Sequence, residues 1–215
     1  MERIEDGNLV ILAGGPAGDF ANNIYIVIDR TTNEAAFVDA PAEPEKAIAM
    51  ARDAGVEPGA ILLTHSHGDH TAGISALKTE FGCKLYADPR EPWLVQGQLD
   101  HLVSHGDDIP VGRLSFRVLS VPGHTPGSTS YVHGLHAFVG DTLFPGGPGR
   151  SASPEALQEE ISSITTYLYG LADETVIYPG HGARTTIGES KQEYAVFAAK
   201  EHDPGLHGDV LWASS

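Results

Sequence analysis

The sequence feature that most constrains this chain is a short run, THSHGDH, from Thr64 to His70. It places three imidazoles and one carboxylate in a single segment. The apolar, β-prone residues 61–64 are typical of a buried strand, and residues 71–78 have the spacing of a helix. Neutral imidazole and ionised carboxylate are the ligands that zinc and similar divalent metals prefer. Because alternate side chains point in different directions, this one turn could supply ligands to two metal ions.

Three later residues extend the candidate site: His124, Asp141 and His181. Each stands, like His65, just beyond the end of an apolar run that is predicted to be a strand. His124 also lies between two Pro-Gly pairs in the segment VPGHTPGS, which would present it rigidly. The sequence therefore predicts that one rim of the sheets collects all the candidate ligands.

Short apolar runs separated by turn residues predict strands at residues 9–12, 24–28, 35–38, 61–64, 84–87, 114–119, 129–132, 137–139 and 175–178. Helical spacing predicts helices at residues 44–54, 71–78, 154–171 and 189–200, with Ser153 as the N-cap of the third. Many consecutive strands have no helical crossover between them, which argues against a doubly wound sheet. The pattern favours an α+β fold, with two packed sheets and helices outside them.

The composition bounds the size and the partners of the protein. A chain of 215 residues with 41% apolar content can form a sizeable core, and we expect a single domain over residues 1–215. Acidic residues outnumber basic ones by 29 to 13, so the net charge repels nucleic acid and anionic membrane surfaces. The first residues carry no signal-like apolar stretch, and no window approaches a membrane span, which favours a cytoplasmic location. We expect a small-molecule substrate, no nucleic-acid partner and no membrane partner.

The HxHxDH run, followed by three single ligands in this order, resembles the metallo-β-lactamase fold superfamily. Within that superfamily it is similar to short bacterial hydrolases of the glyoxalase II (hydroxyacylglutathione hydrolase) type. The segments GDTLFPGG at residues 140–147 and TTIGE at residues 185–189 resemble the same group. This resemblance implies a four-layer αββα sandwich.

The resemblance also implies the metal ligands and the chemistry. It assigns the first metal ion to His65, His67 and His124, the second to Asp69, His70 and His181, and the bridging position to Asp141. Two zinc ions are the expected cofactors, with iron or a mixed iron and zinc pair as the alternative. A hydroxide that bridges the metals would attack the carbonyl of a small thioester or ester, and Asp69 could orient it. Asp69 and Asp141 are therefore the candidate catalytic residues.

Other activities stay open at this point. A mononuclear iron dioxygenase that acts on a persulfide shares this fold and uses a two-histidine, one-carboxylate site, which here would be His65, His124 and Asp141. A lactone hydrolase and a non-catalytic metal-binding protein are further alternatives. The sequence also leaves open the acyl group, its thiol or alcohol carrier, the metal in the cell and the oligomeric state, a homodimer included.

Several residues near the candidate site have less specific roles. Asp39, at the end of a strand, is expected to order a neighbouring loop and not to bind metal itself. Phe144 could form a wall of the substrate pocket. Arg150 is more consistent with a solvated loop residue than with a group that binds a substrate carboxylate. The lone Cys83 is expected to be a buried structural thiol.

The remaining histidines lack the spacing of ligands, and surface or hydrogen-bonded positions account for them. They are His101, His105, His133, His136, His202 and His207. The C-terminal tail, which carries the last two, could fold back over the site. The mixed pattern of residues 90–112 predicts a partly irregular surface segment that borders the site, with a short helix at residues 91–98.

Overall fold

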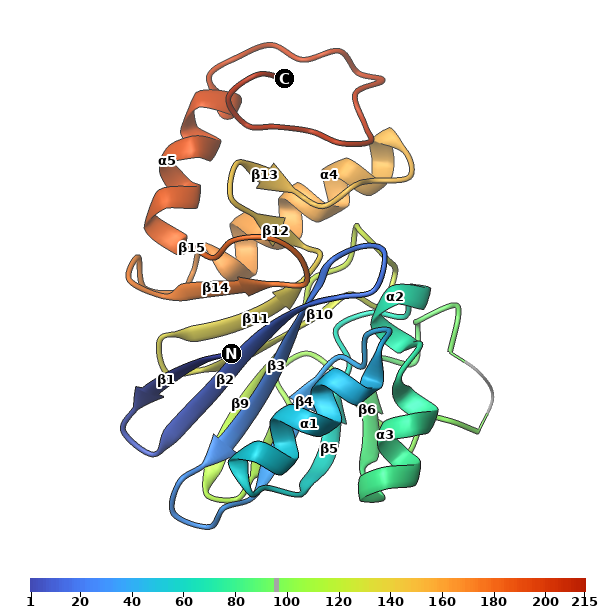
Figure 1. Cartoon of the computed structure of the whole chain (residues 1–215). Helices are drawn as coiled ribbons and strands as arrows, with labels where there is room; N and C mark the ends of the chain where they lie inside the picture. The colour runs from blue at the N-terminus through green and yellow to red at the C-terminus, as the bar shows by residue number, and fades with distance from the viewer. Residues whose placement is uncertain (95–96) are drawn as a thin grey trace.

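Two stacked β-sheets form the centre of this computed structural model, which describes residues 1–94 and 97–215 (Figure 1). The first sheet has seven strands, paired in their order along the chain. They are β1 (Glu2–Asp6), β2 (Leu9–Ala17), β3 (Asn22–Asp29), β4 (Ala35–Val38), β5 (Pro58–Leu62), β6 (Lys84–Ala87) and β7 (His101–Leu102). The pairing is antiparallel from β1 to β4 and parallel from β4 to β7.

The second sheet has six strands in the order β15-β14-β11-β10-β9-β8. They are β8 (Asp108–Val111), β9 (Leu114–Ser120), β10 (Thr129–His133), β11 (His136–Gly140), β14 (Val176–Pro179) and β15 (Thr185–Thr186). β11 and β14 pair in parallel, whereas the other neighbours pair antiparallel. A separate two-stranded sheet is formed by β12 (Leu143–Phe144) and β13 (Gly147–Pro148).

Helices occur where the chain crosses between parallel strands, because a parallel pair cannot be joined by a hairpin. α1 (Pro44–Ala54) connects β4 to β5, and α2 (Gly68–Thr71) with α3 (Ile74–Phe81) connects β5 to β6. α4 (Pro154–Ser163) and the π-helix η1 (Ile164–Leu168) lie between β13 and β14. α5 (Ile187–Ala198) follows β15.

Alternation along the central strands builds three apolar layers. In β3, Ile24 and Ile26 face the helices α1 and α3, whereas Tyr25 and Val27 face the second sheet, since successive strand residues point to opposite sides. The outer face of the second sheet packs against α4 and α5. Figure 1 shows the two helix pairs on opposite sides of the stacked sheets. The expected α+β fold with four αββα layers is confirmed.

Two predicted helices differ from those observed. The helix expected at residues 71–78 is divided into α2 and α3, because the backbone N–H of Gly73 donates to the carbonyl oxygen of Ala40 at 2.8 Å and not to a residue of the preceding turn. The helix expected at residues 154–171 is α-helical only to the end of α4 and continues as η1. The expected cap is confirmed, because the hydroxyl of Ser153 accepts a hydrogen bond from the backbone N–H of Ala156.

The segment at residues 90–112 contains β7 and β8, which the sequence did not predict. Such short strands are defined by their hydrogen bonds to a neighbouring strand and not by their own alternation. The short helix expected at residues 91–98 includes residues 95 and 96, which lie outside the described residues, and residues 92–93 form a turn. Cys83 is buried, as expected, and burial raises the pKa of its thiol to about 11.

The helices found in residues 1–94 and 97–215 all lack the length and hydrophobicity needed to span a membrane.

Candidate metal centre

The seven predicted ligands meet at one rim of the two sheets. His65, His124, Asp141 and His181 follow the ends of β5, β9, β11 and β14 respectively. The other three, His67, Asp69 and His70, lie at the start of α2, in the connection after β5. Their donor atoms form close groups. The sheets thus bring together residues that are far apart in the chain.

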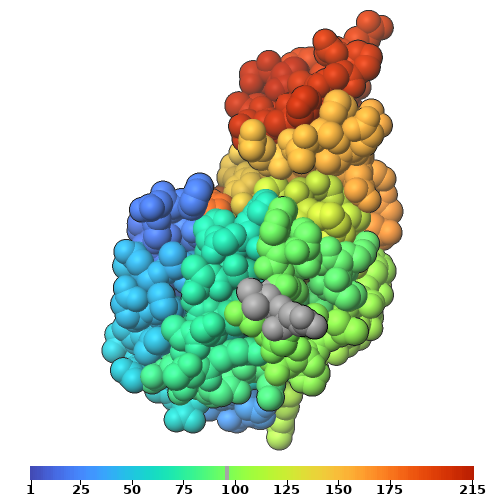
Figure 2. Space-filling view, turned by 90° about the vertical axis from the view of Figure 1, so that its right-hand side faces the viewer, coloured from blue at the N-terminus to red at the C-terminus, as the bar shows by residue number. Residues whose placement is uncertain are grey.

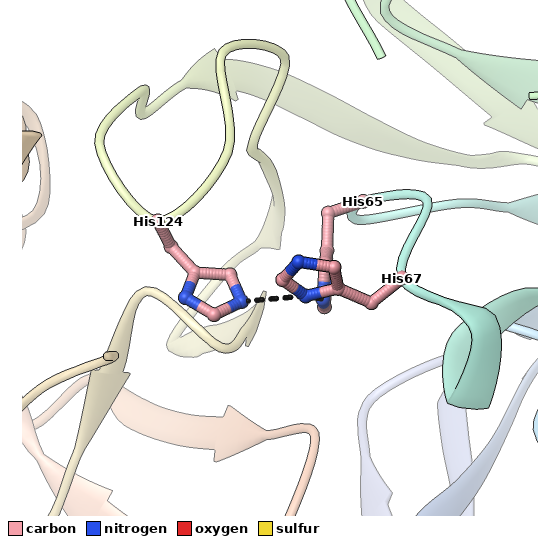
Figure 3. Close-up of side chains that lie close together, drawn as sticks. All are labelled: His65, His67 and His124. Carbon is pink, nitrogen blue, oxygen red and sulfur yellow. Dashed lines mark hydrogen bonds between the residues drawn. The ribbon is translucent and has the colours of Figure 1, made fainter. Parts of the chain in front are cut away.

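The first trio consists of His65, His67 and His124. The Nδ1 atom of His67 lies 3.0 Å from Nε2 of His65 and 3.0 Å from Nε2 of His124. Figure 3 shows the three rings directed toward one another from two loops. Nδ1 of His124 donates to the carbonyl oxygen of Arg150 at 3.0 Å, which leaves the Nε2 lone pair facing the trio. Three ring nitrogens therefore converge on one point.

The second trio consists of Asp69, His70 and His181. Oδ2 of Asp69 lies 3.3 Å from Nε2 of His70 and 3.2 Å from Nε2 of His181. The outer ring nitrogens are also held, because Nδ1 of His70 donates to Asp39 at 2.8 Å and Nδ1 of His181 donates to the carbonyl oxygen of Phe20 at 2.8 Å. These bonds direct both Nε2 atoms inward.

Asp141 lies between the two trios. Its Oδ1 is 3.4 Å from Nε2 of His70, and its Oδ2 is 3.3 Å from Nε2 of His181 and 3.9 Å from Nε2 of His124. Among the described residues, its buried Oδ1 has no hydrogen-bond partner. A carboxylate that contacts both groups is suited to bridge two cations.

The pKa values of the two trios differ in direction. Burial lowers the pKa of all three histidines of the first trio, which keeps them neutral and able to bind a metal. Burial opposes ionisation of Asp69 and Asp141, but close contacts with the imidazoles of His181 and His70 outweigh it and hold the pKa of both carboxyls below the usual range.

In the second trio the imidazoles gain protons. Burial alone would lower the pKa of His181, but hydrogen bonds to Asp141 and Asp69 raise it to about 9. The pKa of His70 is also raised, against burial, by the charge of Asp39 and by its contact with Asp141. These protons balance the carboxylates in the way that a cation would, so metal binding would displace them.

Gly180 allows two of the ligands to lie against the backbone. An added Cβ on Gly180 would lie 2.5 Å from Cε1 of His70 and would also contact Oδ1 of Asp141. Only a residue without a side chain permits this close approach. The convergent nitrogens and the buried carboxylate oxygen without a partner together fit a centre of two metal ions.

Two supporting residues have no signature in the sequence. Glu91 is 6% exposed, and its carboxylate accepts hydrogen bonds from the backbone N–H and hydroxyl of Ser66, both at 2.6 Å, and from the hydroxyl of Thr125 at 2.5 Å. It therefore joins the turn of His65 and His67 to the loop of His124. The other supporting residue is Asn22, which contacts the second trio.

Asp39 orders the loop that carries the histidines, in agreement with its expected role. Its carboxylate accepts from the backbone N–H of Thr64 at 2.7 Å as well as from His70. Arg150 is exposed, as expected, with a side chain 75% accessible, and its contribution to the centre is the carbonyl oxygen that orients His124.

A cavity of about 550 Å³ opens onto the centre. Its lining includes Asn22, His67, Asp69, Asp141, His181 and Phe20, the last of which is 70% exposed. Trp93 stacks on His67 with 4.9 Å between ring centroids. Phe144 lies 6.5 Å from the ring of His181, but the aromatic residue that lines the cavity is Phe20.

Most of the remaining histidines contact groups outside the centre. His133 donates a hydrogen bond to the carbonyl oxygen of Ser115, and His136 forms a hydrogen bond with the hydroxyl of Tyr178. His105 accepts a hydrogen bond from the backbone N–H of Ser120. His101 stacks on Tyr86, and His202 stacks on Phe197.

The C-terminal tail does not bring His202 or His207 to the centre. Val210 and Trp212 bury the tail against the outer layer of α4 and α5, and Gly208 pairs with Ser151. Figure 2 shows this segment, in red, at one end of the molecule.

Comparison with known proteins identifies the family. The model of the metallo-beta-lactamase superfamily matches residues 17–195. The hydroxyacylglutathione hydrolase GloC of Haemophilus influenzae is 31% identical over 198 residues, which cover 82% of this chain and 93% of that protein. The predicted resemblance is confirmed.

Solved structures agree with this match. The crystal structure of ETHE1 from Myxococcus xanthus is similar with a TM-score of 0.76 and 29% identity, covering 88% of this chain and 86% of that one. The crystal structure of TTHA1623 in a di-iron-bound form gives a TM-score of 0.72 at 29% identity, covering 84% and 97%. The chain therefore belongs to the metallo-beta-lactamase superfamily.

Proposed function

We propose that this protein is a dimetal hydrolase of a small thioester or ester. The observation that carries the proposal is the position of Asp141, whose carboxylate contacts both trios at the floor of an open cavity. The hydroxyacylglutathione hydrolase name of the Haemophilus relative supports hydrolysis of a thioester.

The proposed ligands are those of the two trios, with Asp141 shared between them. Zinc is the proposed metal, because imidazole and carboxylate ligands suit it, and the di-iron form of one structural relative supports iron as the alternative. Two such cations would lower the pKa of a bound water to about 7 and so supply a nucleophile at neutral pH.

Residues of the cavity would position the reactants. Asp69 is ionised and 17% exposed at the cavity, so it can accept a hydrogen bond from the attacking water and orient it. Phe20 and Trp93 offer exposed aromatic surface to the acyl or carrier group. Attack by water breaks the C–S or C–O bond and releases a carboxylic acid and a thiol or alcohol.

The test combines metal analysis with a substrate panel. Protein purified without added metal is analysed for metal content and then assayed on thioesters, esters and lactones. About two metal ions per chain with thioester or ester hydrolysis would support the proposal. Hydrolysis confined to lactones would point to the lactonase alternative.

Two other outcomes would overturn the proposal. About one iron per chain with thiol-dependent oxygen uptake would identify the mononuclear iron dioxygenase, which would use His65, His124 and Asp141. Two bound metals without turnover on any substrate would indicate a metal-binding protein.

A further inference from the structure

Asn22, the first residue of β3, is a buried amide that faces the second trio. Its side chain is 1% exposed. Its Nδ2 lies 2.9 Å from Oδ2 of Asp69, 3.3 Å from Nε2 of His70 and 3.5 Å from Nε2 of His181. One amide group is therefore within reach of all three ligand atoms of the second trio.

The backbone holds Asn22 in this place. It forms an isolated β-bridge with His181 and pairs with Ala17 where the register of β2 and β3 shifts. The neighbouring Asn23 donates its side-chain amide to the carbonyl oxygens of Pro179 and Gly182, on either side of His181. Asn22 and His181 are thus fixed relative to each other before any ligand binds.

Folding stability alone does not explain a buried amide here. Among the described residues, Oδ1 of Asn22 has no hydrogen-bond partner. A buried polar atom without a partner costs about 1–3 kcal/mol, and an apolar residue of similar size would avoid that cost. The amide is instead explained by the hydrogen bond from its Nδ2 to the ionised carboxylate of Asp69.

We infer that Asn22 is a positioning residue for the second metal ion, an inference that rests on the proposed dimetal function. Asp69 lies on α2, a helix of four residues whose N-cap has no side-chain hydrogen bond. The hydrogen bond from Asn22 directs Oδ2 of Asp69 toward His70 and His181. Asp69 would thus be oriented before a metal ion binds.

The first trio provides an internal reference. Asn22 contacts the second trio and not the nitrogens of His65, His67 or His124 in the described part of the chain. Loss of a hydrogen bond that orients a ligand typically weakens metal binding by about 10–100-fold. Loss of Asn22 should therefore weaken binding of one metal ion and leave the other unchanged.

The experiment uses the full chain, stripped of metal and titrated with zinc ions against a chromophoric chelator. Asn22→Ala removes the amide, and Asn22→Leu removes it while keeping a similar volume. Asn8→Ala, in the exposed turn between β1 and β2, is the matched control. Thermal melting of the metal-free proteins reports on folding independently.

The expected result is a second zinc ion bound about 10–100-fold more weakly in both Asn22 variants, with the first unchanged. Asn22→Leu should melt higher than Asn22→Ala, because both variants lose the hydrogen bond to Asp69 and the amide oxygen that has no partner, but only Ala also leaves a cavity. Asn8→Ala should match the wild type throughout.

Two results would overturn the inference. In the first, the wild type binds two zinc ions, and both Asn22 variants either bind the second ion with an affinity within threefold of the wild-type value or lose affinity for both ions equally. Asn22 then does not position the second site. If the wild type itself fails to bind two, the dimetal proposal fails as well.

Discussion

The carboxylate of Asp39 joins the end of β4 to the metal centre, because one oxygen accepts from Nδ1 of His70 at 2.8 Å and the other from the backbone N–H of Thr64 at 2.7 Å. Asp39 has a left-handed backbone with φ of +62°, which Asp and Asn tolerate better than most residues. The bond to His70 also fixes which ring nitrogen faces the centre.

Asp39→Asn should therefore weaken binding of one of the two metals without unfolding the chain. An amide has a single carbonyl oxygen, so it cannot accept both hydrogen bonds. We expect the second metal ion to bind about 10–100-fold more weakly, measured by chelator competition. Unchanged affinity for both metals would show that this contact only orders the loop.

Asp141→Ala should lower the occupancy of both metal positions, because its carboxylate contacts both trios. We expect both affinities to fall by about 100-fold and turnover to be lost, measured by elemental analysis and by hydrolysis of the best substrate. His202→Ala is the control, since its ring contacts Phe197 and not the centre. Two tightly held metals in Asp141→Ala would refute the bridge.

Glu91→Ala should destabilise the protein and weaken the first metal ion more than the second. It leaves the buried donors of Ser66 and Thr125 without their acceptor, which should reduce the free energy of unfolding by about 1–3 kcal/mol. Urea denaturation and zinc titration measure the two effects. Glu159→Ala, an exposed change on α4, should alter neither, and an equal loss in that variant would argue against a specific role for Glu91.

Gly180→Ala should reduce metal binding because it displaces two of the proposed ligands. The added methyl group would lie 2.5 Å from Cε1 of His70 and would also overlap Oδ1 of Asp141, so both side chains would have to move. We expect fewer than two metals per chain by elemental analysis. Gly59→Ala, where a Cβ meets nothing within 4 Å, should keep the metal content of the wild type. Full occupancy in Gly180→Ala would mean that the metals lie elsewhere.

Glu160→Gln should reduce the loss of folding stability as the pH rises. Glu160 is fully buried, and burial raises its pKa well above the ordinary value of 4.5 for a Glu side chain. Above about pH 4.5 the folded state keeps a proton that the unfolded state releases. The contribution of Glu160 to the free energy of unfolding is therefore fully present below that pH and is lost as the pH rises toward the raised pKa of the folded state. Gln imitates the protonated form.

The measurement for Glu160 is urea denaturation of both proteins at about pH 5 and about pH 8. The wild type should lose more stability than Glu160→Gln between these two values. Other groups titrate equally in both proteins and cancel in the comparison. Parallel losses would show that Glu160 is not the group responsible.

The sequence alone determined the general arrangement of the fold and identified the candidate ligands of the centre. The continuous apolar run from Ile24 to Val27 marks a buried strand, and the THSHGDH run marks a turn rich in ligands. Both are local patterns, so they can be recognised without knowing what the segment contacts. The same reasoning explains why the cap at Ser153 could be predicted.

Tertiary structure alone decided which residues hold the ligands in place. Asn22 meets Asp69 across 47 residues of sequence, and Glu91 meets Ser66 across 25. Such contacts follow no periodicity, because they depend on which strand ends the sheets bring together. The two nitrogens of each imidazole are also indistinguishable in a sequence. Only folded partners such as Asp39, beside His70, determine which nitrogen faces the metals.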